Sequence, residues 1–148
     1  MKSPFEKYLQ QADSFVYEVA RVTGEPTNIS RAIRIIVALF RSLRERISPE
    51  ESMQLVAQLP MILKAVYVDG WKLSKKSESG DMLFNFLDDV RKKCGPSGDT
   101  DLGNDTKAAM IIQNVLGVLR NYVSEGEFQD IRAQLPAEVA QLFERIEA

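Results

Sequence analysis

Apolar residues recur every three or four positions along most of the chain, which is the spacing of amphipathic helices. The first such stripe comprises Phe5, Tyr8, Leu9, Ala12, Phe15, Val16 and Val19, and it ends near Gly24-Glu25-Pro26. A second predicted helix runs from about Asn28 or Ser30 to Ile47, and Ile33 and Val37 widen its apolar face. No segment alternates with the period of two that a half-buried strand requires. The pattern therefore predicts an all-α protein.

Short polar motifs predict where the next helices begin. In Ser48-Pro49-Glu50-Glu51, the serine can cap free backbone amides and the proline suits the first helical position. Glu51 can reach back to the amide of Ser48 and complete a capping box. Leu59-Pro60 then breaks the chain, because proline disfavours helix at the residue before it. A fourth helix is expected from Met61 to about Asp69.

The same pattern occurs twice. Residues 107–143 repeat residues 31–67 at a constant offset of 76, with 11 of 37 positions identical and both copies reaching Ala-Gln-Leu-Pro. Upstream, Phe86–Val90 followed by Gly95 matches Phe15–Val19 followed by Gly24. The second copy then contains about five inserted residues, within 96–103, before the two copies align again. The second copy therefore predicts a matching fourth helix from Ala137 to about Ile146.

The repeat predicts about eight helices, arranged as two tandem four-helix repeats within a single domain, residues 1–148, with approximate internal twofold symmetry. The first repeat spans about 5–71, a Lys- and Ser-rich linker about 72–80, and the second repeat about 81–148. Each half alone would have a marginal core. The halves are therefore expected to pack together through the long helices near Ile33–Phe40 and Ile111–Val118.

Composition excludes much chemistry. The chain has no histidine and one cysteine, Cys94, so zinc sites built on histidine or cysteine and histidine-dependent catalytic triads cannot form within it. Asp99–Asp105 departs from a calcium loop, with Gly103 one place early and Met110 at the last ligand position, so helix capping is the simpler interpretation. We expect no catalytic residue, metal or cofactor, and hence no enzyme.

Charge and hydropathy point to a soluble protein, and the lone Cys94, which cannot form an internal disulfide, suits a reducing cytoplasm. The net charge is −2, and no apolar run approaches the ~20 residues that span a bilayer. The segment Met1–Phe5 lacks the apolar centre of a signal peptide. Neither membrane nor nucleic acid is an expected partner.

Two sets of arginines are candidate functional residues. Arg31, Arg34, Arg41 and Arg44 share a helix face opposite the apolar stripe. This face is either an anion-binding surface, helped by Lys72, Lys75 and Lys76, or a solvated surface with local ion pairs. Only Arg44 recurs in the second copy, as Arg120, which argues against a shared binding role.

Glu51 and Glu127 recur together with Arg44 and Arg120. This predicts a salt bridge or carbonyl contact between the second and third helices of each half.

The clearest difference between the copies lies at Tyr67–Trp71, because Phe143 and Glu147 occupy the matching places in the second copy. Gly70 allows a turn that can aim the indole of Trp71 inward or outward. Trp71 therefore either closes the core beneath the linker or serves as an aromatic anchor in a partner or ligand groove. Tyr67, Trp71, Arg34 and Arg41 are the candidate interaction residues.

The doubled pattern resembles the uncharacterised bacterial domain-of-unknown-function family 2267 over roughly residues 5–147. Ala57–Pro60, Tyr67–Trp71 and Ala133–Pro136 carry the resemblance most specifically. The resemblance implies an all-helical bacterial protein of two related halves, and no site residue, cofactor or partner. The leading hypothesis is a non-catalytic interaction or structural module, either homodimeric or bound to another protein. The alternative is a small-ligand or anion-binding module that uses the inter-repeat cleft or the arginine face.

Overall fold

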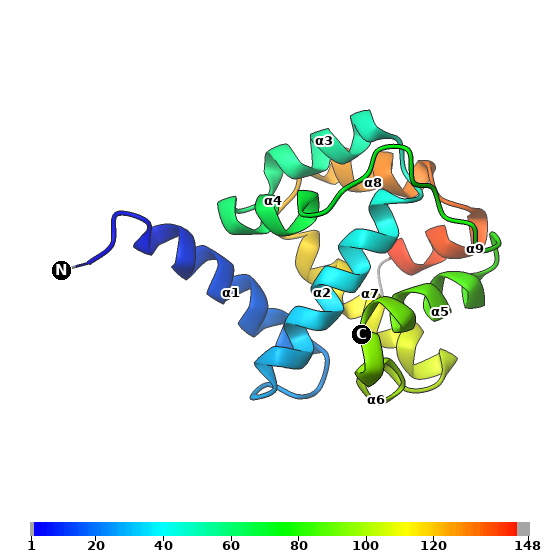
Figure 1. Ribbon diagram of the computed structural model, residues 1–148, viewed down its shortest axis with the longest axis horizontal. Coiled ribbons are helices and arrows are strands. Elements are labelled where there is room, and N and C mark those ends of the chain that lie inside the picture. Colours follow the sequence, from blue (N-terminus) through cyan, green and yellow to red (C-terminus); the bar gives the residue numbers. More distant parts are fainter. Residues whose placement is uncertain (1, 145–148) are drawn as a thin grey trace.

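A computed structural model describes residues 2–144 and shows an all-α fold (Figure 1). Over these residues the chain forms nine α-helices, two short 3₁₀ turns and no strand. The α-helices are α1 Glu6–Val22, α2 Ile29–Arg44, α3 Pro49–Gln58, α4 Met61–Val68, α5 Leu83–Lys93, α6 Gly98–Leu102, α7 Asp105–Leu119, α8 Glu125–Ala133 and α9 Ala137–Ala140. The 3₁₀ turns are η1 Gly95–Ser97 and η2 Gln141–Phe143.

Four polar side chains cap helices, and the cap at Ser48 is the one predicted from its motif. Ser48 Oγ and Ser124 Oγ accept hydrogen bonds from the backbone N–H groups of Glu51 and Glu127, each at 3.1 Å. Asn28 and Asn104 cap α2 and α7 in the same way. Each cap satisfies an amide that has no partner within its own helix.

The predicted capping box is wrong in one respect, because the Glu51 side chain does not return to Ser48. The Ser48 N–H donates instead to Gln134 Oε1 at 2.7 Å, and the Ser124 N–H donates to Gln58 Oε1 at 2.6 Å. The glutamine of each Ala-Gln-Leu-Pro motif thus caps a helix in the other half of the chain. The side chains of Glu51 and Glu127 therefore take no part in capping.

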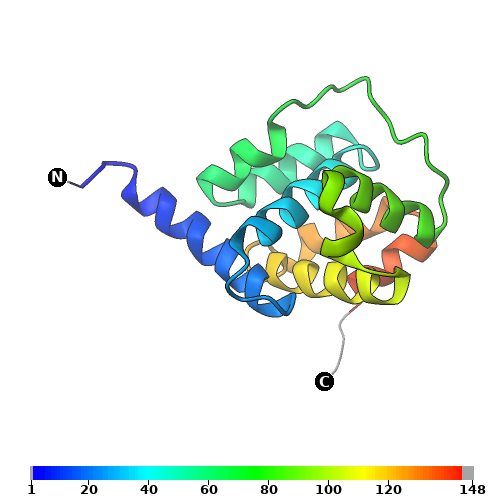
Figure 2. The same ribbon diagram turned by 60° about the horizontal axis from the view of Figure 1, so that its bottom comes forward.

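The two halves are intertwined. Helix α2 packs against α5, α1 packs against α7, and α3 lies against α8 (Figures 1 and 2). The predicted packing of the two long helices through Ile33–Phe40 and Ile111–Val118 is therefore wrong as the principal contact. Ile33 is 46% exposed, whereas Leu39 and Ile112 are buried within the shared core. Each long helix packs against the first helix of the other half as well as against helices of its own half.

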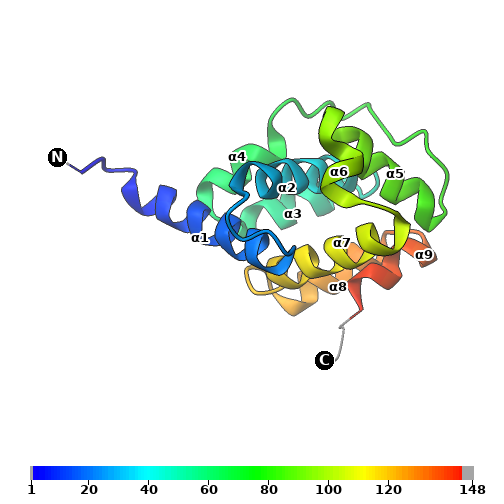
Figure 3. The same ribbon diagram turned by 90° about the horizontal axis from the view of Figure 1, so that it is seen from below.

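The insertion in the second copy forms η1 and α6, which fold back onto α5 (Figure 3). Gly98 permits this close approach: a Cβ atom at that position would lie 2.1 Å from the carbonyl oxygen of Arg91. Leu102 anchors the insertion by burying its side chain completely. The insertion places Asp101 beside the first turns of α2.

Both ends of the chain depart from the predicted pattern. The first turns of α1 extend beyond the other helices (Figure 3), so Phe5 and Leu9 are 64% and 48% exposed while Phe15 and Val19 are buried. At the other end, α9 stops at Ala140 and tightens into η2, whereas a helix to about Ile146 is predicted. The last part of that prediction, and Glu147, lie outside the described residues. Over the described residues, no helix has the length and hydrophobicity to cross a membrane.

Candidate functional site

Arg31 is buried, which contradicts the prediction that it belongs to a solvent-facing cationic surface. It is 2% exposed, and its guanidinium donates to the carbonyl oxygens of Asp101, at 2.8 Å, and Thr23, at 3.1 Å. Glu25 supplies its counter-charge at 3.0 Å. Arg31 therefore joins the start of α2 to the insertion and to the end of α1.

Arg34 also binds the insertion, through the side chain of Asp101. Its Nε and Nη2 atoms donate to the two carboxylate oxygens of Asp101 at 2.8 and 2.9 Å. This fork-to-fork geometry is strong and directional. Arg34 therefore holds α6 against α2, and it does not lie with the other candidate interaction residues.

Arg41 and Arg44 lie near the other end of α2, where positive charge is poorly compensated. Arg44 Nη1 donates to the carbonyl oxygens of Tyr67 and Asp69, both at 2.7 Å, so its predicted contact with Glu51 is wrong. Burial and the neighbouring Arg41 guanidinium lower the pKa of Arg44. Among the described residues, Arg41 forms an ion pair with Asp69 alone, at 3.8 Å. Carbonyls orient Arg44 without neutralising its charge.

Tyr67 and Trp71 take different positions. Tyr67 is completely buried, and its hydroxyl lies 2.7 Å from Ser52 Oγ, so it is not a surface contact. Trp71 packs edge-on against Tyr67 with ring centroids 5.9 Å apart, and it remains half-buried. The indole thus covers the core with one edge and stays accessible on the other.

Trp71 lies between cavities that follow the linker. Three adjoining cavities of about 210, 340 and 440 Å³ all include Glu45 in their walls, and Trp71 lines the first two. We call this combined surface the Trp71 groove. The basic residues in its walls are Arg41, Arg44, Arg46, Lys72, Lys75, Lys76 and Lys93, and the acidic ones are Glu45 and Asp81. The groove therefore carries a local excess of positive charge in a chain whose net charge is −2.

Part of this charge is neutralised by fixed ion pairs. Glu45 contacts Lys93 Nζ at 2.7 Å and Lys75 Nζ at 3.5 Å. Asp89, outside the groove, binds Arg46 at 2.8 Å. Among the described residues, Lys72 and Lys76 form no ion pair, and Arg44 contacts only carbonyls. The side of the groove around Trp71 therefore has cations available to an acidic ligand.

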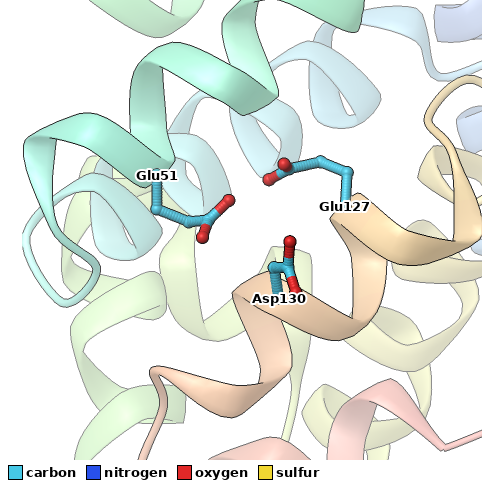
Figure 4. Close-up of side chains that lie close together, drawn as sticks. All are labelled: Glu51, Glu127 and Asp130. Carbon is cyan, nitrogen blue, oxygen red and sulfur yellow. The ribbon is translucent and has the colours of Figure 1, made fainter.

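A second cluster, entirely acidic, lies where α3 meets α8. Glu51 from α3 and Glu127 and Asp130 from α8 point toward one another, and one carboxylate oxygen from each lies within 4.8 Å of the other two (Figure 4). Glu51 is 7% exposed and Glu127 is 5% exposed, whereas Asp130 is open to solvent. Burial, together with the adjacent Glu51, raises the pKa of Glu127. We call these three residues the carboxylate cluster.

The surroundings of the carboxylate cluster do not neutralise it. Gln134 Nε2 donates to Glu51 Oε1 at 3.2 Å, but Glu127 Oε2 is buried without a hydrogen-bond partner. The Gln54 amide borders both glutamates, and with its nitrogen turned inward it donates to Glu127 Oε1 at 3.2 Å and Glu51 Oε2 at 3.3 Å. No arginine or lysine in the described part of the chain forms an ion pair with the cluster.

The predicted pairing of Arg120 with Glu127 is also wrong. Arg120 forms a two-pronged contact with Glu125 and lies over the ring of Phe128, 4.7 Å from its centroid. It still joins the second and third helices of its half, as expected, but through a different residue. A cavity of about 340 Å³ between α1 and α7 is lined by Arg120, so the cation in that inter-repeat cleft is already paired.

Cys94 is a structural thiol, as its position at the end of α5 predicts. It is 5% exposed, and burial raises its pKa to about 11. Because the thiolate is the reactive form, native Cys94 is expected to react with a thiol reagent at about pH 8 at least a hundredfold more slowly than the unfolded chain. Absorbance-monitored titration with and without denaturant checks this, and equal rates would show that Cys94 is accessible in the folded protein.

These features define an all-helical protein with a cationic, tryptophan-walled groove and a buried carboxylate cluster. The family model described as "Uncharacterized conserved protein (DUF2267)" matches residues 12–142, and the chain belongs to this family. The resemblance found in the repeat motifs is thereby confirmed. No curated protein matches the chain significantly in sequence.

Proposed function

We propose that this protein is a non-catalytic, cytoplasmic interaction module that binds an acidic segment of another protein in the Trp71 groove. The observation that carries the proposal is the placement of Trp71, half-buried and accessible, between two cavities with cationic walls. Aromatic and arginine side chains are the residues that dominate binding energy at protein interfaces. The positive charge of the groove favours a negatively charged partner.

The shape of the groove favours an extended chain over a compact anion. The cavities continue from Arg41 past Trp71 and along the linker to Pro136, so the groove is elongated. Arg44 is held in place by two carbonyl oxygens that leave its charge unneutralised. A preorganised donor of this kind reduces the entropy cost of binding. A chain without histidine also lacks the commonest general base, in keeping with a binding role.

The proposal includes an approximate internal twofold relation between the halves as the scaffold of the groove. Its support is the reciprocal capping by Gln58 and Gln134, together with the facing positions of Glu51 and Glu127. In the second half, the position matching Tyr67 is Phe143, and the residue matching Trp71 lies outside the described part of the chain. The binding surface is therefore assigned to the first half only.

A fluorescence titration tests the groove directly, because Trp71 is the single tryptophan of the chain. An oligoglutamate peptide of about ten residues is expected to change the Trp71 emission and to bind less tightly as salt is raised. The triple variant Arg41→Gln, Lys72→Gln, Lys75→Gln is expected to weaken binding at least tenfold. Trp71→Phe should retain more affinity than Trp71→Ala when binding is followed with a labelled peptide.

A matched control removes the same charge elsewhere: Lys7→Gln, Lys92→Gln, Lys107→Gln, three exposed cations outside the groove. This variant should bind within about twofold of the wild type, and an equal loss in both triple variants would contradict the assignment. Inorganic phosphate serves as the small-anion probe, and saturation by phosphate alone at micromolar concentration would favour the ligand-binding alternative. Solution mass measured in parallel reports homodimerisation, which remains a prediction.

A further inference from the structure

The carboxylate cluster presents an electrostatic problem that the described protein groups do not solve. Two glutamates, each more than nine-tenths buried, face one another across the contact between the halves. Like charges buried at short range destabilise a fold strongly unless a proton or a cation intervenes. The buried, unpartnered Glu127 Oε2 atom marks the place where such a partner is missing.

The geometry suits a divalent cation. Two oxygen ligands of one Ca²⁺ ion, each about 2.3–2.6 Å from it, lie at most roughly 4.6–5.2 Å apart. One carboxylate oxygen from each of Glu51, Glu127 and Asp130 lies within 4.8 Å of the other two. The Gln54 amide borders both glutamates and can present its oxygen to an ion in place of its nitrogen. Asp130 opens the cluster to solvent, which gives an ion a path inward.

We propose that Glu51, Glu127 and Asp130 bind an oxygen-preferring divalent cation, with Ca²⁺ as the best fit, that ties α3 to α8 and so joins the two halves of the protein. Three carboxylates match a doubly charged ion better than a single shared proton. This site is separate from the Trp71 groove and does not depend on the function proposed for that groove. Because its ligands come from both halves, occupancy stabilises the association of the halves rather than either one alone.

Calcium-dependent thermal stability of the full chain tests the proposal. After chelation and buffer exchange, Ca²⁺ at about a hundredfold excess over its dissociation constant is expected to raise the melting temperature by about 5–10 °C. Direct calorimetric titration should give one ion per chain. Sodium chloride at equal ionic strength should not reproduce the shift, and an equal shift with sodium chloride would overturn the site.

Two variants separate ion binding from a purely structural effect. Glu127→Gln keeps the side-chain shape and should abolish the calcium-dependent shift, whereas Glu50→Gln, at an exposed position on α3, should retain it. Asp130→Asn leaves the buried pair intact and is expected to weaken calcium binding at least tenfold. If the wild type shows no shift with Ca²⁺, or Asp130→Asn and Glu127→Gln both keep the full shift, the cluster holds only a proton and the proposal fails.

Discussion

Replacing Arg31 with methionine is expected to lower the free energy of unfolding by about 3–5 kcal/mol. The substitution removes the donor to the carbonyl oxygens of Asp101 and Thr23, which are then left without that hydrogen bond in a buried site. It also removes one of the two arginine contacts that hold the insertion to α2, and the contact of α2 with the end of α1. Urea denaturation followed by circular dichroism measures the loss.

Two control substitutions distinguish this role from a general effect of removing charge. Lys107, the residue that matches Arg31 in the repeat, is exposed, and Lys107→Met should change stability by less than about 0.5 kcal/mol. Arg34→Lys, which keeps a cation beside the buried Asp101 carboxylate but loses the two-pronged contact, should cost about 1 kcal/mol. A loss for Arg31→Met no larger than that for Lys107→Met would show that the buried hydrogen bonds contribute little.

Replacing Glu127 with glutamine is expected to stabilise the calcium-free protein by about 1–4 kcal/mol near pH 8 and to change its pH dependence. The pKa of Glu127 rises from 4.5 to about 8 in the folded protein, so between these values the folded state binds more protons than the unfolded state. The free energy of unfolding of the wild type should therefore fall as pH rises from about 5 to about 8. The variant lacks this titration and should show a flatter profile.

The measurement is denaturant unfolding at several pH values in the presence of a chelator, with Glu50→Gln as the control for removal of an exposed carboxylate. The control should follow the wild-type profile. Parallel profiles for the wild type and Glu127→Gln would mean that Glu127 is ionised across the whole range, with its charge accommodated by solvent or by the protein.

Local sequence signals predicted the helices well, because caps and breaks depend on neighbouring residues. Ser48 caps α3 as expected, α2 begins next to Asn28 as the pattern indicates, and Leu59-Pro60 ends α3 where predicted. The errors lie at interactions between distant segments. Glu51 is a good capping-box residue by local rules, but Gln134 from the other half takes the amide that Glu51 would have satisfied.

The residues of the Trp71 groove were predicted only in part. Trp71 and Arg41 were separate candidates in the sequence, and the structure places both in the wall of one cavity with the linker lysines Lys72 and Lys75. Arg31 and Arg34 lie on the same helix face as Arg41, but both form hydrogen bonds with Asp101 of the insertion. The spacing of residues along α2 could not predict this, because it says nothing about where the insertion packs. Asp130 was missed because the matching residue in the first copy is Gln54, so the repeat gave no sign of a shared acidic role.

The sequence by itself determined the helical class, the starts and stops of most helices, and the family, since these follow from residue periodicity and short motifs. Only the tertiary structure decided how the halves exchange helix contacts, which arginines are buried, and which acidic groups meet. The repeated glutamine of Ala-Gln-Leu-Pro illustrates the difference. Its recurrence was visible in the sequence, but its hydrogen-bond partners were not. The partner of Gln58 is Ser124, 66 residues away, and the partner of Gln134 is Ser48, 86 residues away. Contacts at such separations are set by the packing of whole helices, and that packing also brings Glu51 and Glu127 together.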